Sequence, residues 1–176
     1  ADMIVHGQNV WMMLEDLGPA VPALASGSPV SADTGSAPKT RRVWEQGATG
    51  FRAFENGGAA VAPVSKPTQG YTPYYPSAGV YGSHIYFDDA NLRSALSGSG
   101  TVVERVQVYL YAEHWHSAAG GAAGIWTHPY SSAWSTLGSM SHIVTPSFGR
   151  GQGRWVDLPT TGWNDGSRRG VGLYPP

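Results

Sequence analysis

The stretch "VVERVQVYLYAEHW", from Val102 to Trp115, decides the fold class of this chain. Its residue types alternate with a period of two, and successive side chains of a β-strand point to opposite faces of a sheet. One face would comprise the mainly aliphatic set Val102, Glu104, Val106, Val108, Leu110 and Ala112, and the other the set Val103, Arg105, Gln107, Tyr109, Tyr111 and Glu113. The pattern predicts a long strand in a sheet with one buried side.

Further short strands follow along the chain, at a spacing of roughly 10 residues. They are "GAAGIWTHPY", "HIVTPSF", "GRWVDLP" and "RRGVGLYPP". The chain contains 24 Gly and 13 Pro residues, which suit the many turns of such a fold. The arrangement predicts an all-β protein, a jelly-roll or β-sandwich. In "GRWVDLP", Trp155 alternates with Val156, which favours a core position for Trp155.

A single helix is expected over "DDANLRSAL". Asp88 or Asp89 can cap its N-terminus, because a carboxylate accepts hydrogen bonds from the free N–H groups of the first turn. Leu92, Ala95 and Leu96 would form its apolar side. The expected fold is therefore a β-sandwich with one short helix.

The first 70 residues differ in composition, and we interpret them as an extended N-terminal arm with an anchoring role. Residues 19–40 are rich in Pro, Ala, Ser and Gly, as is typical of linkers that gain order on a partner. Strand-like pieces return in residues 41–66, where Asn56-Gly57-Gly58 fits a hairpin turn. The expected domains are an arm over 1–70 and a sandwich over 71–176.

The start of the chain permits two interpretations. Residues 3–5 and 10–14 are short apolar runs that can pair as a hairpin across "HGQN". The alternative is a short helix over residues 9–17, ended by Gly18-Pro19. We favour the strands.

The composition of the chain argues against some binding partners and some cellular locations. The net charge is −1, and 13% of residues are charged, without the basic face that nucleic-acid binding normally needs. No apolar run reaches the length of a membrane span, and no signal peptide is recognisable. We therefore expect no nucleic-acid partner, no membrane span and synthesis in the cytoplasm. The chain has no cysteine, so core packing and assembly must stabilise it.

Three segments follow one another along the chain: "IYFDDANLRSAL", "VVERVQVYLYAEHWHSAAGGAAGIWTH" and "GRWVDLPTTGWNDGSRRGVGLYP". Together they resemble a β-sandwich module of minor tail and other virion proteins from tailed phages of actinobacteria. The shared marks are a Phe before a short helix, the "VYLY..HW" strand, a Gly-rich hairpin and the late "WVDLP", "W..G" and "GVGL" motifs. The resemblance covers residues 71–176, and that module is similar in layout to jelly-roll carbohydrate-binding modules.

The resemblance implies a non-enzymatic structural component at the surface of a virion, either a minor tail, a fibre or a head-decoration protein. It also implies that the N-terminal arm contacts other virion proteins and that the protein forms a homo-oligomer, with a trimer as our expectation. Recognition of host-envelope glycans is compatible with this role. The alternatives are a stand-alone carbohydrate-binding module and a glycan hydrolase.

The "HWH" motif raises the question of a metal site. His114 and His116 would point to one face of a strand, and His128 or Glu113 could supply a further zinc ligand. However, H-x-H without a spaced ligand set has low specificity, and we expect no metal. We instead expect His114 and Trp115 to fix the end of a hairpin that turns at Gly120-Gly121, whose small neighbours allow another surface to approach closely.

Exposed aromatic residues are the candidates for glycan binding, because sugars stack on aromatic rings. The predicted platform residues are Trp115, Trp126, Tyr130, Trp134 and Trp163. The segment "HPYSSAWSTLGSM" reads as an exposed contact loop. The alternative is that Trp134 folds over the edge of the sandwich.

Carboxylates give no clear catalytic or calcium signal. No nucleophile elbow, HExxH motif or phosphate loop is present, and Gly149 to Gly153 reads as a turn. A glycosidase that uses two carboxylates remains the enzymatic alternative, because such a pair has no sequence signature. The acidic candidates for calcium are scattered, so we expect no cofactor; they are Asp88, Asp89, Glu113, Asp157 and Asp165.

Overall fold

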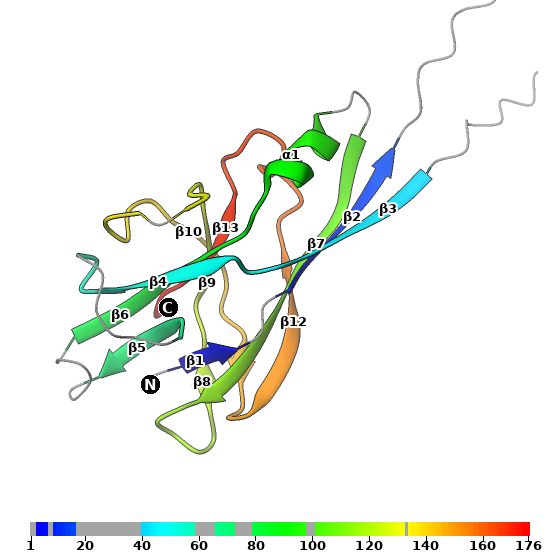
Figure 1. Ribbon diagram of the computed structural model, residues 1–176. Helices are drawn as coiled ribbons and strands as arrows, with labels where there is room; N and C mark the ends of the chain where they lie inside the picture. Colours follow the sequence, from blue (N-terminus) through cyan, green and yellow to red (C-terminus); the bar gives the residue numbers. More distant parts are fainter. Residues whose placement is uncertain are drawn as a thin grey trace, which may run out of the picture.

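The protein is an all-β sandwich of antiparallel strands, with one short helix among the residues that the structure describes (Figure 1). This computed structural model describes residues 3–6, 9–16, 40–58, 66–72, 79–97, 101–132 and 134–176. It confirms the fold class predicted from the sequence.

The first sheet is built around the long strand β7 (Thr101–His114). Strand β12 (Gln152–Leu158) pairs with one edge of β7, and β1 (Met3–His6) and β2 (Asn9–Asp16) pair with the other. Strand β3 (Thr40–Gly47) pairs with β2. All of these strand pairs are antiparallel, so the sheet does not need the long crossover connections that join parallel strands.

The predicted strands near the start of the chain exist, and the helical alternative is wrong, but the predicted hairpin between them is also wrong. Ile4 lies opposite His114, and Val10 lies opposite Val108. Strands β1 and β2 thus follow each other along the same edge of β7. Both runs find their hydrogen-bond partners on β7, which is long enough to pair with the two in succession.

The second sheet has the order β4 (Gly50–Glu55), β6 (Gly79–Tyr86), β13 (Gly170–Leu173), β9 (Ile125–His128) and β10 (Ser141–Val144). Strand β5 (Thr68–Thr72) pairs with both β1 and β6 and so connects the two sheets. A separate pair consists of β8 (Gly121–Ala122) and β11 (Ser147–Phe148).

The core lies between the sheets, and β7 supplies its centre. The aliphatic face predicted for this strand is confirmed from Val106 to Ala112, where every second residue is fully buried. Opposite Met13 and Leu14 the register shifts, and beyond this bulge the faces exchange. Val102 is consequently 44% exposed, whereas Val103 packs against the core, the reverse of the predicted assignment. The rest of the core consists of Ile85, Phe87, Leu92, Leu96, Trp115, Ala123, Ile125, Phe148, Val156, Leu158, Trp163, Val171 and Leu173.

Helix α1 (Ala90–Leu96) confirms the predicted helix and its apolar side. Asp88 Oδ1 accepts a hydrogen bond from the backbone N–H of Ala90 at 3.2 Å. Asp89 occupies the N-cap position but makes no side-chain capping bond, because Arg169 binds its carboxylate through two nitrogens. Of the two capping candidates, Asp88 therefore performs the local hydrogen bonding.

The described strands of residues 3–72 belong to the sandwich itself. Strands β1 to β4 pair with β2, β6 or β7 and their neighbours, and Phe54 on β4 is fully buried. The boundary expected at residue 70 thus runs within β5 and does not separate two sheets. The predicted linker at 19–40 lies outside the described residues, apart from Thr40 at the start of β3.

Candidate functional site

A stacked aromatic pair stands on the loop between β9 and β10. The rings of Tyr130 and Trp134 are 4.7 Å apart between centroids and only 14° from parallel. The Trp134 side chain is 48% exposed, compared with 39% for Trp155. Two predicted platform residues are thus brought together. The Trp134 ring packs over the sandwich through Tyr130, in line with the alternative interpretation, and still leaves about half of its surface exposed.

Backbone hydrogen bonds fix the loop that carries this pair. The N–H of Trp134 donates to the Tyr86 hydroxyl at 3.2 Å, and the N–H of Ser139 donates to the Tyr130 hydroxyl at 2.9 Å. Gly138 has a φ of +57°, and a Cβ there would lie 2.3 Å from the Tyr130 hydroxyl oxygen. Only glycine fits, so the loop holds the two rings in position before any ligand arrives.

Two buried histidines support the pair from below. The ring of His84 on β6 lies 4.4 Å from that of His128 on β9, and both rings pack against Tyr130, at 5.1 Å and 5.6 Å. His128 Nδ1 accepts a hydrogen bond from the N–H of Tyr130 at 3.2 Å. Its Nε2, 3.1 Å from the Ile85 carbonyl oxygen, is then the protonated nitrogen that donates. The platform therefore rests on a rigid aromatic layer.

Burial keeps both imidazoles neutral. Desolvation lowers the pKa of His84 to about 4, partly offset by a hydrogen bond with the backbone of Leu137. Desolvation, together with the neighbouring His84, lowers the pKa of His128 to about 3. A charge on either ring would be buried without a counter-ion, since the adjacent groups are the phenols Tyr86 and Tyr130 and the ring of Phe54.

The other predicted platform residues lie elsewhere. Trp115 is fully buried, and a Cβ on Gly121 would lie 3.0 Å from its ring. Trp163 is 4% exposed, and its Nε1 donates to the Pro159 carbonyl oxygen at 2.7 Å. Both predictions of exposure are wrong, because both rings belong to the hydrophobic core. Trp126 is half-buried beside His142, and its Nε1 donates to the Tyr174 carbonyl oxygen.

Trp155, which the sequence predicted to lie in the core, is instead exposed. It is 39% exposed and contacts Tyr109 on the outer face of the first sheet, at 5.3 Å between ring centroids. The alternation in β12 is present, but Val156 and Leu158 take the inward face. The periodicity of the sequence was informative, whereas the choice of face for Trp155 was wrong.

The histidines of the "HWH" motif and His128 do not come together as a group in the described part of the chain. His116 is exposed, His114 is half-buried on β7, and His128 has both nitrogens engaged in the layer below Tyr130. In the described part of the chain, no group of three potential metal-ligating side chains comes together. The three candidate ligands therefore have different surroundings.

The glycine-rich segment after this motif does not form a β-hairpin; other segments of the chain pack closely against its glycines. Strand β8, which follows it, pairs with β11 and not with β7. A Cβ on Gly120 would lie 1.9 Å from the Phe148 carbonyl oxygen, and one on Gly124 would lie 2.0 Å from the Tyr174 carbonyl oxygen. The small residues thus allow close approach, as expected, and the approaching segments belong to the same chain.

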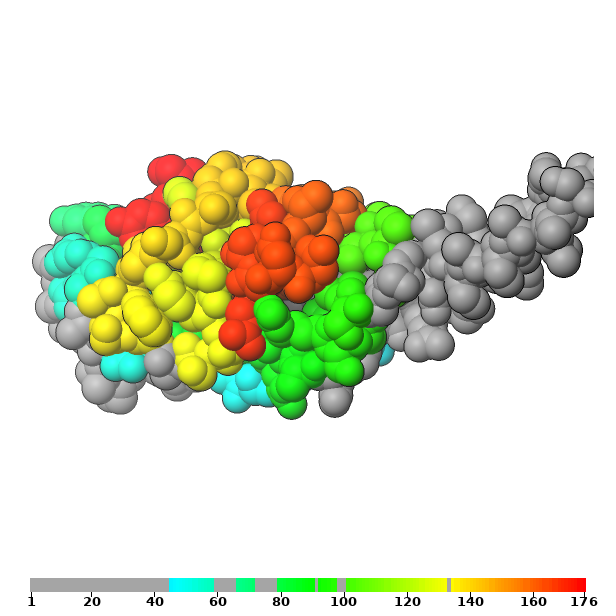
Figure 2. Space-filling model, turned by 90° about the horizontal axis from the view of Figure 1, so that it is seen from above, coloured from blue at the N-terminus to red at the C-terminus, as the bar shows by residue number. Residues whose placement is uncertain are grey.

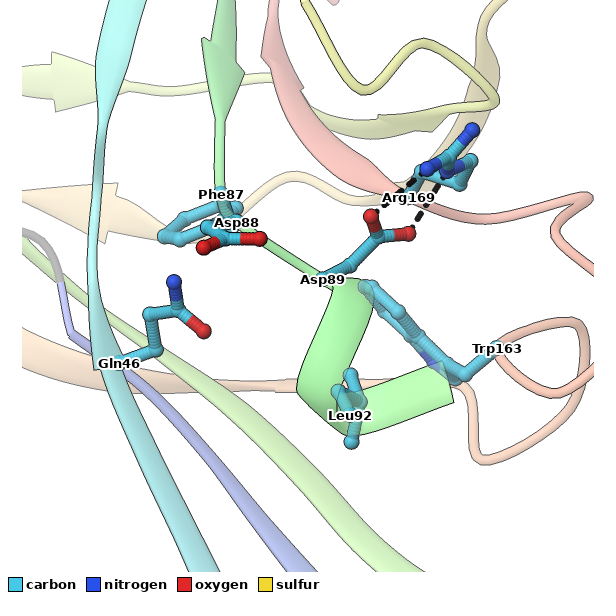
Figure 3. Close-up of a pocket in the computed structure, with 7 residues that line it drawn as sticks. All are labelled: Gln46, Phe87, Asp88, Asp89, Leu92, Trp163 and Arg169. Atoms are coloured by element: carbon cyan, nitrogen blue, oxygen red, sulfur yellow. Dashed lines mark hydrogen bonds and ion pairs between the residues drawn. The ribbon is translucent and has the colours of Figure 1, made fainter. Parts of the chain in front are cut away.

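A cavity opens beside helix α1, with a volume of about 300 Å³ that includes space open to solvent (Figure 3). Its apolar walls are Phe87, Leu92 and Trp163. Gln46, Asp88 and the Asp89–Arg169 ion pair supply its polar groups. The sequence identified Asp88 and Asp89 only as capping residues, and no local pattern connects them with Gln46.

The segments that form the two sites share one face of the molecule. Figure 2 shows the surface of residues 134–140 in yellow, of residues 159–169 in orange to red and of α1 in green, all visible together. Leu92 of α1, Trp163 and Arg169 line the cavity.

No family model, curated protein or solved structure matches this chain. In the part of the chain that is described, no helix has the length and apolar character needed to cross a bilayer. The class of protein that the structure itself defines is an antiparallel β-sandwich with an exposed aromatic pair on a fixed loop.

Proposed function

We propose that this protein is a non-enzymatic component of a tailed-phage virion whose β-sandwich binds host-envelope carbohydrate through Tyr130 and Trp134. The observation that supports carbohydrate binding most is the half-exposed Trp134 ring stacked on Tyr130. The apolar face of a pyranose ring packs well on an exposed indole, while its hydroxyls remain hydrated or bind nearby polar groups.

Preorganisation makes this pair a better candidate than an isolated surface tryptophan. Ordering a side chain on binding costs about 0.5–1.5 kcal/mol. Here the hydrogen bonds to Tyr86 and Tyr130 and the positive φ of Gly138 have already fixed the loop. Most of that cost is therefore met by folding, and more of the stacking energy contributes to affinity.

The location in a virion is supported by the resemblance of residues 71–176 to virion β-sandwich modules. The proposal includes contacts of the N-terminal region with other virion proteins and a homotrimeric assembly. Labelling of intact particles with an antibody against this protein tests the location: signal on the head or the tail supports it, and absence from particles that infect normally contradicts it. The second outcome would leave a stand-alone carbohydrate-binding module.

Binding to purified host cell-wall polysaccharide tests the carbohydrate platform. We expect Trp134→Ala to weaken binding roughly tenfold, equivalent to about 1.4 kcal/mol. Trp155→Ala is the matched control, because it removes an exposed tryptophan from the outer face of the first sheet. Unchanged binding by Trp134→Ala, or an equal loss in both variants, would contradict the assignment.

A further inference from the structure

The loop between β9 and β10, which carries Tyr130 and Trp134, is joined to the second sheet through one buried layer. The N–H of Trp134 donates to the Tyr86 hydroxyl and the N–H of Tyr130 donates to His128 Nδ1, each at 3.2 Å. His84 contacts both acceptors, with its Nδ1 3.3 Å from the Tyr86 hydroxyl oxygen and its ring 4.4 Å from that of His128. The attachment of the loop to the sheet therefore depends on two histidines.

Both imidazoles are enclosed and face neutral or cationic groups. His84 is 0% exposed and His128 is 1% exposed. The titratable groups that face them are the two tyrosines of the layer, and β4 contributes the cation Arg52, directly opposite His84 in the strand register. Strand β13 contributes the backbone of Gly170, which lies against His128. In the described part of the chain no carboxylate packs against the two rings, so a proton there would be a buried charge without a counter-ion.

His128 must also be neutral to hold the loop. Its Nε2 donates to the Ile85 carbonyl oxygen at 3.1 Å, which leaves Nδ1 as the acceptor for the Tyr130 N–H. A second proton would occupy Nδ1 and face that N–H, so the hydrogen bond would be lost. A loop that leaves the sheet exposes both imidazoles to water, where they can take up protons. The attached loop thus requires neutral rings, and the detached loop does not.

From these contacts we propose that acid detaches the β9–β10 loop from the second sheet and so stops ligand binding by the Tyr130–Trp134 pair. The switch regulates the site of the proposed function and rests on that function only for the identity of the ligand. Opening of the loop itself needs no ligand. Carbohydrate is then bound at neutral pH and released at acidic pH.

The pKa values give the direction and the size of the effect. Desolvation lowers the pKa of His84 to about 4 and that of His128 to about 3, from the ordinary value of 6.5. Below pH 6.5 the open form binds protons that the closed form does not, so opening becomes more favourable as the pH falls. Between pH 7 and 4.5 the opening equilibrium should rise roughly 60-fold for each histidine and a few thousandfold for both.

Amide hydrogen exchange followed by NMR tests this opening without a ligand. The reporters are the N–H groups of Tyr130, Trp134 and Ser139, and the amides of β7 in the core are the internal reference. Corrected for the intrinsic pH dependence of exchange, the protection factors of the loop amides should fall at least about a hundredfold from pH 7 to 4.5, to values below those of β7. Unchanged loop protection, or a loss shared equally with β7 through global unfolding, would overturn the proposal.

His84→Phe tests whether the histidine layer senses the acid. Phenylalanine keeps a ring in the layer but cannot take up a proton, so the loss of loop protection should shrink by at least about tenfold. The matched control, His116→Phe, replaces an exposed imidazole outside the layer and should behave as the wild-type protein does. An undiminished pH dependence in His84→Phe, or a diminished one in His116→Phe, would overturn the proposal. If His84→Phe does not fold, the wild-type pH series still decides.

Binding of purified host cell-wall polysaccharide at pH 7 and 4.5 connects the switch with the ligand. The wild-type protein should lose at least about tenfold in affinity at pH 4.5 and regain it on return to pH 7, because only the closed loop binds. Constant affinity over this range overturns the switch and leaves the platform. If the polysaccharide fails to bind at pH 7 while the loop amides still lose protection at pH 4.5, the proposed function fails and the acid opening stands.

Discussion

Trp115 and Trp134 are the same residue type in similar sequence surroundings, yet they have opposite roles in the fold. Small and polar residues follow both, and both were candidates for an exposed platform. Trp115 follows the end of β7, where the chain passes into the core, and it is fully buried. Trp134 lies on a connection outside the sheets, with one face on Tyr130 and the other open to solvent. The comparison shows that position in the topology, and not local composition, decides which aromatic residue is available to a ligand.

The largest expected effect in this comparison is on stability. Trp115→Ala removes a fully buried ring and leaves a cavity in the core, which should lower the free energy of unfolding by about 3–5 kcal/mol. Urea unfolding measures this change. Trp134→Ala should alter stability by no more than about 0.5 kcal/mol, as is usual for exposed positions. Similar losses in the two variants would show that the two tryptophans are not in the environments described.

Gly138→Ala should produce an intermediate effect by distorting the support of the exposed pair. A Cβ at a φ of +57° is strained, and it would overlap the Tyr130 hydroxyl. We expect a loss of about 1–3 kcal/mol in stability, in the range of strained backbone positions, together with weaker polysaccharide binding. The control, Gly50→Ala, adds a Cβ where nothing lies within 4 Å and the φ is not positive. Full binding by Gly138→Ala would mean that the loop need not be held in this form.

Acid should weaken the layer below the pair. The pKa values of His84 and His128 in the folded protein, about 4 and about 3, lie below the ordinary value of 6.5. Between 6.5 and these values the unfolded chain binds protons that the folded protein does not, so the free energy of unfolding falls as the pH is lowered through this window. Urea midpoints at pH 7, 5.5 and 4.5 measure the decline.

His84→Phe removes one of the two buried imidazoles whose pKa is lowered by desolvation. Its urea midpoint should depend less steeply on pH than that of the wild-type protein. The matched control is His116→Phe, which replaces an exposed imidazole outside this layer. Identical pH profiles for His84→Phe and the wild-type protein would rule out His84 as a contributor.

The smallest expected effect is for a substitution of Trp155, the exposed tryptophan that lies outside the proposed binding loop. Its ring contacts Tyr109 on a sheet face and has no fixed loop beneath it. Trp155→Phe should therefore change both stability and polysaccharide binding by less than about 0.5 kcal/mol. A loss of binding as large as that of Trp134→Ala would indicate that the carbohydrate binds at Trp155 on the sheet face and would contradict the assignment to Tyr130 and Trp134.

Predictions from the sequence were correct where a residue pattern lies within a single strand or helix. The alternation from Val106 to Ala112 and the apolar side of α1 are local and were predicted correctly. The reversal at Val102 results from a bulge that depends on the partner strand β2, which the alternation of β7 alone does not encode. Local periodicity therefore predicts strands well and their irregularities poorly.

The candidate sites depend on contacts between distant segments, so only part of each site could be predicted from the sequence. Tyr130 and Trp134 were predicted because they are near each other in an exposed loop. The supporting residue His84 comes from β6, and the cavity unites Gln46 with Trp163. No spacing within the chain relates these residues, so their association follows only from the topology.

The most direct test of the central claim is to observe the tryptophan side chains while wall polysaccharide is added. The chain has seven tryptophans, and each indole N–H gives its own NMR signal, which single substitutions can assign. We predict that the Trp134 signal shifts or broadens first and most, while those of Trp115 and Trp155 remain unchanged. A titration in which the Trp155 signal responds and the Trp134 signal does not would contradict it.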